Sequence, residues 1–414
     1  MSHERLSILH LSLVPPSPAT YGAQRRIQGL LGALAKRHDV TGVSLLSPSM
    51  DAEAAERGIR ELGAEAILVS WRPWAKRPKR LQQVRSLASR YSFERRLHTL
   101  PSLQRTLDLL LHRRRYDLVH VEFPCLAHYR LRQAPPGEPS PRLLLDEHNV
   151  EYDLGRQMTG LELGLGRHLY NSLNWRKIRR EELAAWRRFD GVMFTSAQDE
   201  ERAHSSVPSV RSRLIPNAVD LKFFAPSPEY PAPDGRTVLF FGTFNYFPNL
   251  EGMLFFLRET WPRLAASHPG ALLKIIGADP PAEVRAFQGP RVELAGLVPD
   301  VRPHIAQAAA TIVPLRIGGG TRLKVLEAMA MAKPIVSTRL GAEGIDATDG
   351  RELLLADEPE AFAAAVGRVL DDGALAGRLG AAARALAEQR YSWDAVGLDL
   401  ERFFREILAD PARS

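Results

Sequence analysis

The chain has 414 residues, 45% hydrophobic and 25% charged, which is enough for two globular domains of about 200 residues each. Its one cysteine, Cys125, excludes an intramolecular disulfide framework and favours a reducing cytoplasm. The sequence contains no apolar run of 18 residues, no signal-peptide pattern at its start and no histidine or cysteine pair at metal-ligand spacing, so we expect no spanning helix and no metal site.

Strand-like and helix-like segments alternate in the first half of the chain. Residues 6–14 form a continuous apolar run, which is typical of a strand buried on both faces. Helices are predicted over residues 24–36 and about 163–189, and further strands over 40–46, 65–69, 118–122, 142–146 and 191–195. This alternation predicts a doubly wound parallel sheet.

A second alternation follows a proline-rich stretch. Residues 214–233 hold five prolines and suit a linker. Beyond it, strands are predicted over 237–242, 271–276, 292–294, 309–313 and 334–337, and helices over 250–264 and 324–331. The sequence therefore predicts an α/β protein with two Rossmann-like doubly wound domains that face a central cleft.

The net charge of +7 is concentrated in residues 71–115, where thirteen Lys or Arg stand against two acidic residues. Leu81, Val84 and Leu87 fall at helical spacing there. One interpretation is a solvated pair of helices. The other is attachment to an anionic membrane, because each cation near such a surface contributes about 1 kcal/mol. No nucleic-acid-binding signature accompanies the charge, so we expect no nucleic acid partner.

The stretch IGGGTRLKVLEAMA, residues 317–330, is predicted to join a strand to a helix. Glycines let the backbone approach a ligand, and a helix N-terminus attracts anions. Arg322 and Lys324 oppose the helix dipole there unless an anion such as a diphosphate offsets them. Glu327, among apolar residues, needs partners such as ribose hydroxyls. The alternative is a glycine-rich turn in which Glu327 pairs with Arg322 or Arg316.

The longer stretch GGGTRLKVLEAMAMAKPIVSTRLGAEGI resembles the donor-site signature of retaining glycosyltransferases of family 4, which have the two-domain GT-B fold. IPNAVD, residues 215–220, resembles that family's hinge entry, and YSW, residues 391–393, resembles the start of its last helix. The resemblance implies an acceptor-side domain over 1–215, to which a helix at about 392–410 returns. It implies a sugar-nucleotide donor domain over 216–391.

The resemblance also implies roles for particular residues of the donor domain. Glu327 matches the second glutamate of an E-x7-E pair and would contact the ribose, whereas Gly319 stands where the first would be. The family's arginine and lysine after the first donor-domain strand are absent here, so Arg322 and Lys324 are expected to supply that charge. The residues of this domain assigned to donor and diphosphate binding are Gly242, Gly319, Gly320, Thr321, Arg322, Lys324 and Glu327. The resemblance adds Gly22 of the first domain, whose loop before the predicted helix at 24–36 faces the donor phosphate in the family; an ordinary strand-to-helix loop is the alternative.

Polar residues follow the predicted strand that ends at Asp146. The family places a histidine here, near the transferred sugar, so His148 is the candidate catalytic residue. A structural histidine is the alternative. Asn149 and Glu151 are assigned to the acceptor side, and Glu122, at the end of the previous strand, is expected to support His148.

Together these features predict a glycosyltransferase that retains anomeric configuration and needs no cofactor or metal. We expect a nucleotide sugar as donor, a saccharide or lipid-linked acceptor, and a cytoplasmic location. Peripheral attachment to the inner face of the plasma membrane is the open alternative to a freely dissolved protein. A role in cell-surface polysaccharide or glycolipid assembly follows by analogy alone. A sugar-nucleotide epimerase with the GT-B fold and a non-catalytic nucleotide-sugar-binding relic are the alternatives.

Overall fold

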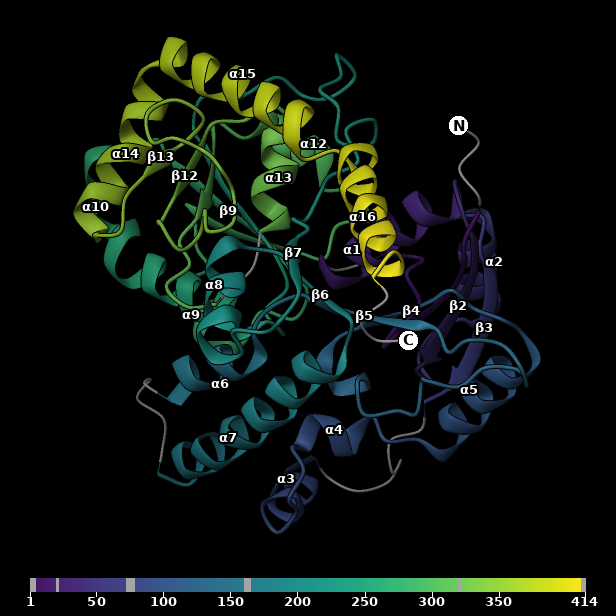
Figure 1. Ribbon diagram of the computed structural model, residues 1–414. Helices are drawn as coiled ribbons and strands as arrows, with labels where there is room; N and C mark the ends of the chain where they lie inside the picture. Colours follow the sequence, from purple (N-terminus) through teal and green to yellow (C-terminus); the bar gives the residue numbers. More distant parts are fainter. Residues whose placement is uncertain (1–4, 20–21, 72–78, 160–164, 319–321, 411–414) are drawn as a thin grey trace. The chain divides into compact units, whose positions relative to one another are not determined.

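The computed structural model describes residues 5–19, 22–71, 79–159, 165–318 and 322–410. Contacts divide the chain into two compact units, Met1–Pro216 with Gly397–Ser414, and Asn217–Val396. Each unit is built on a parallel sheet with helices packed on both faces (Figure 1). The predicted class, α/β with two doubly wound sheets, is confirmed.

In the described residues, the sheet of the first unit has seven parallel strands in the order β3-β2-β1-β4-β5-β6-β7. The order reverses between β1 and β4, and ligands bind at such a point in doubly wound sheets. The strands are β1 (Ser7–Ser12), β2 (Asp39–Leu46), β3 (Glu65–Ser70), β4 (Leu118–Glu122), β5 (Arg142–Glu147), β6 (Gly191–Phe194) and β7 (Ser212–Leu214). The helices are α1 (Gly22–Ala35), α2 (Ala52–Glu61), α3 (Lys79–Leu87), α4 (Phe93–Leu97), α5 (Pro101–Arg113), α6 (Glu151–Thr159), α7 (Leu165–Arg188) and α8 (Ala197–Ser206), with a short 3-10 turn at Pro124–Leu126.

The two faces of this first sheet differ in chemistry. Leu9 and Leu11 of β1 join an apolar core to which α5 and α7 contribute. Side chains alternate along a strand, so His10 points to the other face, where it meets His120. That face is covered by α1 and by α16 (Trp393–Leu408), whose Phe404 ring packs against His120. A polar patch is thus buried between the sheet and these helices.

The second unit has, among the described residues, a six-stranded parallel sheet in the order β10-β9-β8-β11-β12-β13. The strands are β8 (Thr237–Phe241), β9 (Leu272–Ile276), β10 (Val292–Gly296), β11 (Ala310–Val313), β12 (Ile335–Ser337) and β13 (Leu354–Leu355). The helices are α9 (Phe247–Phe255), α10 (Trp261–Ser267), α11 (Ala282–Arg285), α12 (Arg302–Gln307), α13 (Leu323–Ala330), α14 (Pro359–Asp371) and α15 (Gly373–Arg390). Phe240 packs with α9, α10 and α14, whereas Leu239 packs with α13 and α15 on the opposite face.

The helix predicted over 250–264 is longer and irregular. It runs through α9, a π-helical turn at Phe256–Thr260 and α10. Pro262 has no N–H for the α-helical bond to Arg258, and a π turn absorbs that mismatch. Within the described ranges, every helix is too short or too polar to cross a bilayer.

Candidate functional site

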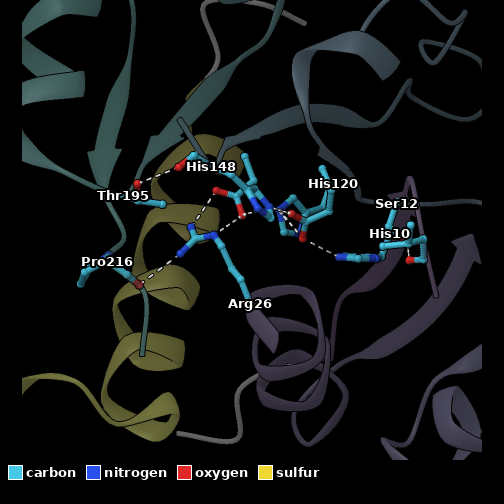
Figure 2. Close-up of polar contacts among 10 residues, drawn as sticks. His10, Ser12, Arg26, His120, His148, Thr195 and Pro216 are labelled. Carbon is cyan, nitrogen blue, oxygen red and sulfur yellow. Dashed lines mark hydrogen bonds and ion pairs between the residues drawn. The ribbon is translucent and has the colours of Figure 1, made fainter. Parts of the chain in front are cut away.

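The first candidate site lies at the carboxyl ends of β1, β4 and β5 in the first unit (Figure 2). His10 of β1 lies opposite His120 of β4, and Glu122 at the end of β4 lies opposite Asp146 of β5. Residues two apart in a strand share a face, so these four side chains gather on the polar face of the sheet. This is the edge at which ligands bind in such folds.

Glu122 is shared by two histidines. Its Oε2 lies 2.6 Å from His148 Nε2 and its Oε1 lies 2.9 Å from His10 Nε2, and all three side chains are buried. Burial alone would raise the pKa of the Glu122 carboxyl, but the hydrogen bonds from His10 and His148 lower that pKa well below its usual range. An ionised carboxylate only accepts hydrogen bonds, so each imidazole carries a proton on Nε2.

Arg26 of α1 is anchored on the end of β5. Its Nε and Nη2 donate to the two oxygens of Asp146 at 2.8 and 2.7 Å, and its Nη1 donates to the Pro216 carbonyl at 3.2 Å. Both side chains of the Arg26–Asp146 pair are fully buried. His148 Nε2 lies 3.7 Å from Asp146 Oδ2. The two-pronged pair therefore fixes the start of α1 beside His148.

The buried polar patch contains residue types that bind metal ions. The distances between their ligand atoms test whether the patch fits a metal. His10, His120 and Glu122, or Glu122, Asp146 and His148, bring their ligand atoms close together. Tetrahedral zinc bonds of about 2 Å would put neighbouring ligand atoms about 3.3 Å apart. The contacts of Glu122 with the histidines, 2.6 and 2.9 Å, are hydrogen-bond lengths instead. Burial lowers the pKa of His120 to about 3, so its ring is neutral.

The polar residues that follow Asp146 have different surroundings in the structure. Strand β5 extends through Glu147, which therefore faces away from His148 and accepts a hydrogen bond from Trp186 Nε1 at 2.7 Å. Glu151 is the first residue of α6, and its backbone N–H donates to Glu182 at 2.8 Å. Burial, followed by the charge of Glu94, raises the pKa of Glu151 to about 7.

Two further predicted residues border this patch. Asn149 is half-buried and follows His148 directly. Gly22 is the first residue of α1, the helix that carries Arg26, and it is exposed.

The second candidate site lies in the second unit, where β8 ends and α13 begins. Lys324 Nζ donates to Asn249 Oδ1 at 2.6 Å and lies 4.3 Å from the centre of the Phe240 ring. A Cβ atom at Gly242 would lie 2.9 Å from Lys324 Nζ, so a larger residue there would displace the Lys324 ammonium group. Burial, followed by the charge of Arg322, lowers the pKa of Lys324 to about 7.

Arg322 is the residue before α13, at the end of the connection from β11, and its side chain is buried. Its Nη2 lies 3.9 Å from Glu343 Oε2. Gly318 has a φ of +118°, and a Cβ atom there would lie 3.0 Å from Arg322 Nη2 and 3.2 Å from Tyr246 Oη. Glycine is thus required at Gly318 both by its backbone conformation and by its neighbours.

The remaining predicted residues of the donor site are placed only in part. Glu327 is buried on α13. Arg316 pairs with Glu251 at 3.4 Å and not with Glu327, which removes one of the alternative pairings. Gly319, Gly320 and Thr321 lie outside the described residues.

Some residues of both sites were not predicted from the sequence. His10 and His120 carried a usable signal, because each is a polar residue inside an apolar strand. Glu343 lies within the stretch that resembles the donor-site signature, but its acidic side chain was not singled out there. Asn249 carried no signal, since it lies far along the chain from Lys324.

Two family comparisons cover most of the chain. Residues 20–223 match the family described as Glycosyltransferase Family 4, and residues 235–372 match the family described as Glycosyl transferases group 1. A curated relative, the D-inositol 3-phosphate glycosyltransferase of Streptomyces griseus subsp. griseus, is 33% identical over 109 residues, which are 26% of this chain and 23% of that protein. The chain spans about a third or less of the length of the curated relatives it matches.

Solved structures resemble the whole fold. Sucrose-phosphate synthase from Thermosynechococcus elongatus matches with a TM-score of 0.72 and 20% identity, covering 97% of this chain and 99% of that one. HepE of Anabaena, solved in complex with UDP-glucose, matches with a TM-score of 0.67 and 14% identity, covering 97% and 100%. At these identities the likeness shows the fold.

Proposed function

The chain is a glycosyltransferase of family 4, and on that premise we propose that it transfers a sugar from a nucleoside-diphosphate sugar to an acceptor hydroxyl with retention of configuration. The observation that carries this proposal is the pair of cations at the start of α13. Arg322 is buried, and burial lowers the pKa of Lys324 to about 7. A bound diphosphate would offset both charges and regain the energy lost to burial.

The second unit is proposed to hold the donor. Arg322 and Lys324 would stabilise the diphosphate as negative charge develops on it, which requires neither metal nor cofactor. The Glu327 carboxylate would accept hydrogen bonds from the ribose. Because HepE was solved with UDP-glucose, UDP sugars are the first donors to test.

The first unit is proposed to handle the acceptor. His148 is the proposed catalytic residue, with Asn149 and Glu151 beside the acceptor. The 2.6 Å contact with Glu122 would hold the His148 ring in one orientation. In a retaining front-face reaction the leaving diphosphate takes the acceptor proton, so His148 would orient the sugar rather than attack it.

A lipid-linked or saccharide acceptor in cell-surface polysaccharide or glycolipid assembly is proposed, with the protein peripheral on the inner face of the plasma membrane. Large apolar side chains are exposed on α3 and α7: Leu81 by 48%, Val84 by 62%, Leu169 by 58% and Leu173 by 40%. Lys177 of α7 joins the helices by donating to the last turn of α3 at 2.8 Å. The exposed arginines around them are Arg85, Arg90, Arg167, Arg176, Arg179 and Arg180. Apolar and cationic side chains together favour an anionic membrane as the partner.

Vesicle sedimentation tests this surface. The wild type should sediment with phosphatidylglycerol vesicles at low salt, and less with phosphatidylcholine vesicles or at high salt. A double change, Leu169→Ser with Leu173→Ser, should reduce binding. The control is Leu297→Ser in the second unit, where the side chain is 77% exposed. Equal binding by the two variants would contradict the membrane proposal.

A thermal-shift panel with UDP, GDP, ADP and dTDP tests the donor site. A nucleotide at a hundred times its dissociation constant should add about 2.7 kcal/mol of stability. Glu327→Gln should reduce that gain. The control, Glu352→Gln, changes another buried glutamate of the same unit, one that accepts the Thr348 N–H at 2.9 Å. It should leave the gain intact.

Turnover assays on the same purified protein, with and without an acceptor, then distinguish the alternative functions. An epimerase would convert a UDP sugar with no acceptor present, whereas a transferase needs the acceptor for transfer. A relic would show no turnover with any donor, and absence of a thermal shift with all four nucleotides would favour it.

A further inference from the structure

We infer that Glu343 binds the sugar of the donor, its buried carboxylate accepting hydrogen bonds from sugar hydroxyl groups. The inference rests on the proposed donor site of the second unit and names a residue that recognises the transferred sugar there.

The loop that carries Glu343 is fixed by hydrogen bonds to the loop after β11. Thr338 N donates to the Val313 carbonyl at 3.2 Å, and Thr338 Oγ1 donates to the Leu315 carbonyl at 2.5 Å. Gly341 N in turn donates to Thr338 Oγ1 at 2.8 Å. Since β11 and β12 are parallel neighbours, both loops leave the sheet at its ligand-binding edge. Glu343 is therefore held beside the start of α13.

Glu343 and Arg322 are buried side by side. Their side chains are 8% and 6% exposed, and Glu343 Oε2 lies 3.9 Å from Arg322 Nη2. That distance allows attraction but is too long for a hydrogen bond between the two. A carboxylate offers about four lone-pair positions, so Glu343 can accept from hydroxyl groups and keep its other contacts. Such hydrogen bonds would lessen the cost of burying the charge.

Charge decides which part of the donor Glu343 meets. A diphosphate seated on Arg322 and Lys324 would be repelled by a carboxylate in direct contact with it. The sugar is bonded to the terminal phosphate, carries no charge and presents hydroxyl donors. Glu343 thus fits the sugar, while the two cations fit the diphosphate.

The competing role for Glu343 is to position Arg322, and the two roles predict different affinities. Glu343→Gln and Glu343→Ala would be measured by calorimetry with UDP, UDP-glucose and UDP-galactose. If Glu343 binds the sugar, both variants keep UDP affinity within about twofold and bind the preferred UDP sugar about tenfold or more weakly, because a charged hydrogen bond is lost. The control is again Glu352→Gln, which should match the wild type for all three ligands.

Each other outcome overturns the inference. Equal weakening for UDP and the UDP sugars would assign Glu343 to positioning Arg322. Unchanged affinity for all ligands would show that Glu343 does not contact the donor. A wild type that binds none of these three ligands, and none of GDP, ADP and dTDP, would refute the proposed donor site itself, so that failure is distinguishable. Melting curves of both variants without ligand separate loss of binding from loss of folding.

Discussion

Lys324 should make nucleotide binding depend on pH. Burial and the charge of Arg322 lower its pKa to about 7, so the free protein loses this cation as pH rises through 7. A bound diphosphate favours the protonated form and raises the Lys324 pKa in the complex. Binding is therefore strongest at and below the free pKa, and it weakens above it.

The magnitude follows from the fraction of free protein that is protonated at Lys324. With a pKa of about 7, that fraction is about one half at pH 7, about one eleventh at pH 8 and about one hundredth at pH 9. The dissociation constant of UDP should rise about fivefold from pH 7 to 8 and about fiftyfold from pH 7 to 9. The terminal phosphate has its second pKa near 6, so UDP itself contributes little slope there.

Calorimetry with UDP across this range measures the slope, and buffers of different ionisation enthalpy should reveal uptake of about half a proton at pH 7. Lys324→Arg keeps its charge and should flatten the profile. The control is Lys333→Met: Lys333 is a buried lysine of the same unit, its pKa is lowered to about 8, and it donates to the Ala306 carbonyl at 2.5 Å. A flat wild-type profile, or an unchanged slope in Lys324→Arg, would refute this reasoning.

Two further substitutions test other contacts of the candidate sites. Gly318→Ala should weaken UDP binding as measured by calorimetry, because the added Cβ would crowd the Arg322 guanidinium. The control is Gly350→Ala, since Gly350 also has a positive φ but a Cβ there would have no neighbour within 4 Å. That variant should lose about 1–2 kcal/mol of stability and bind UDP as the wild type does. Equal UDP affinity in these two variants would count against the Gly318 contact. Arg26→Ala should destabilise the protein by about 3–5 kcal/mol in urea unfolding, because it strands the Asp146 carboxylate, and adding Asp146→Asn should recover part of that loss. A loss below about 1 kcal/mol would mean that water reaches Asp146.

Strands were the most predictable elements of the fold. Strand β4 spans Leu118–Glu122, the predicted range, because Leu118, Val119 and Val121 mark it as a buried strand although His120 and Glu122 interrupt the apolar pattern. Helix α2 (Ala52–Glu61) was missed, since it buries only Ala55, Gly58 and Ile59 and its start depends on the Asp51 cap. Strands β7 and β13 were missed because three and two residues carry no readable period.

The site was predictable where it depends on strand ends and unpredictable where it depends on register. The ends of β4 and β5 were expected to bring Glu122 near His148, and the two lie 2.6 Å apart. The contact of Glu122 with His10 arises because Ile8–Leu11 of β1 pair with Leu118–Val121 of β4, a register that no local pattern reveals. The partners of Lys324 were hidden for the same reason, since Asn249 and Phe240 reach it only through the fold of the sheet.

Burial has different effects on side-chain charge in the two candidate sites. In the first, hydrogen bonds from His10 and His148 keep Glu122 ionised and burial keeps His120 neutral, so neither charge changes near neutral pH. In the second, burial brings the pKa of Lys324 to about 7, where a ligand decides its charge. Groups of fixed charge such as Glu122 and His120 suit the orientation of an uncharged sugar or hydroxyl, whose hydrogen bonds must not vary, whereas Glu151, with its pKa raised to about 7, is not one of them. Lys324 becomes fully protonated only when an anion binds beside it. Such a cation suits a leaving diphosphate, which gains negative charge during the reaction, because its stabilisation by Lys324 is then strongest in the transition state.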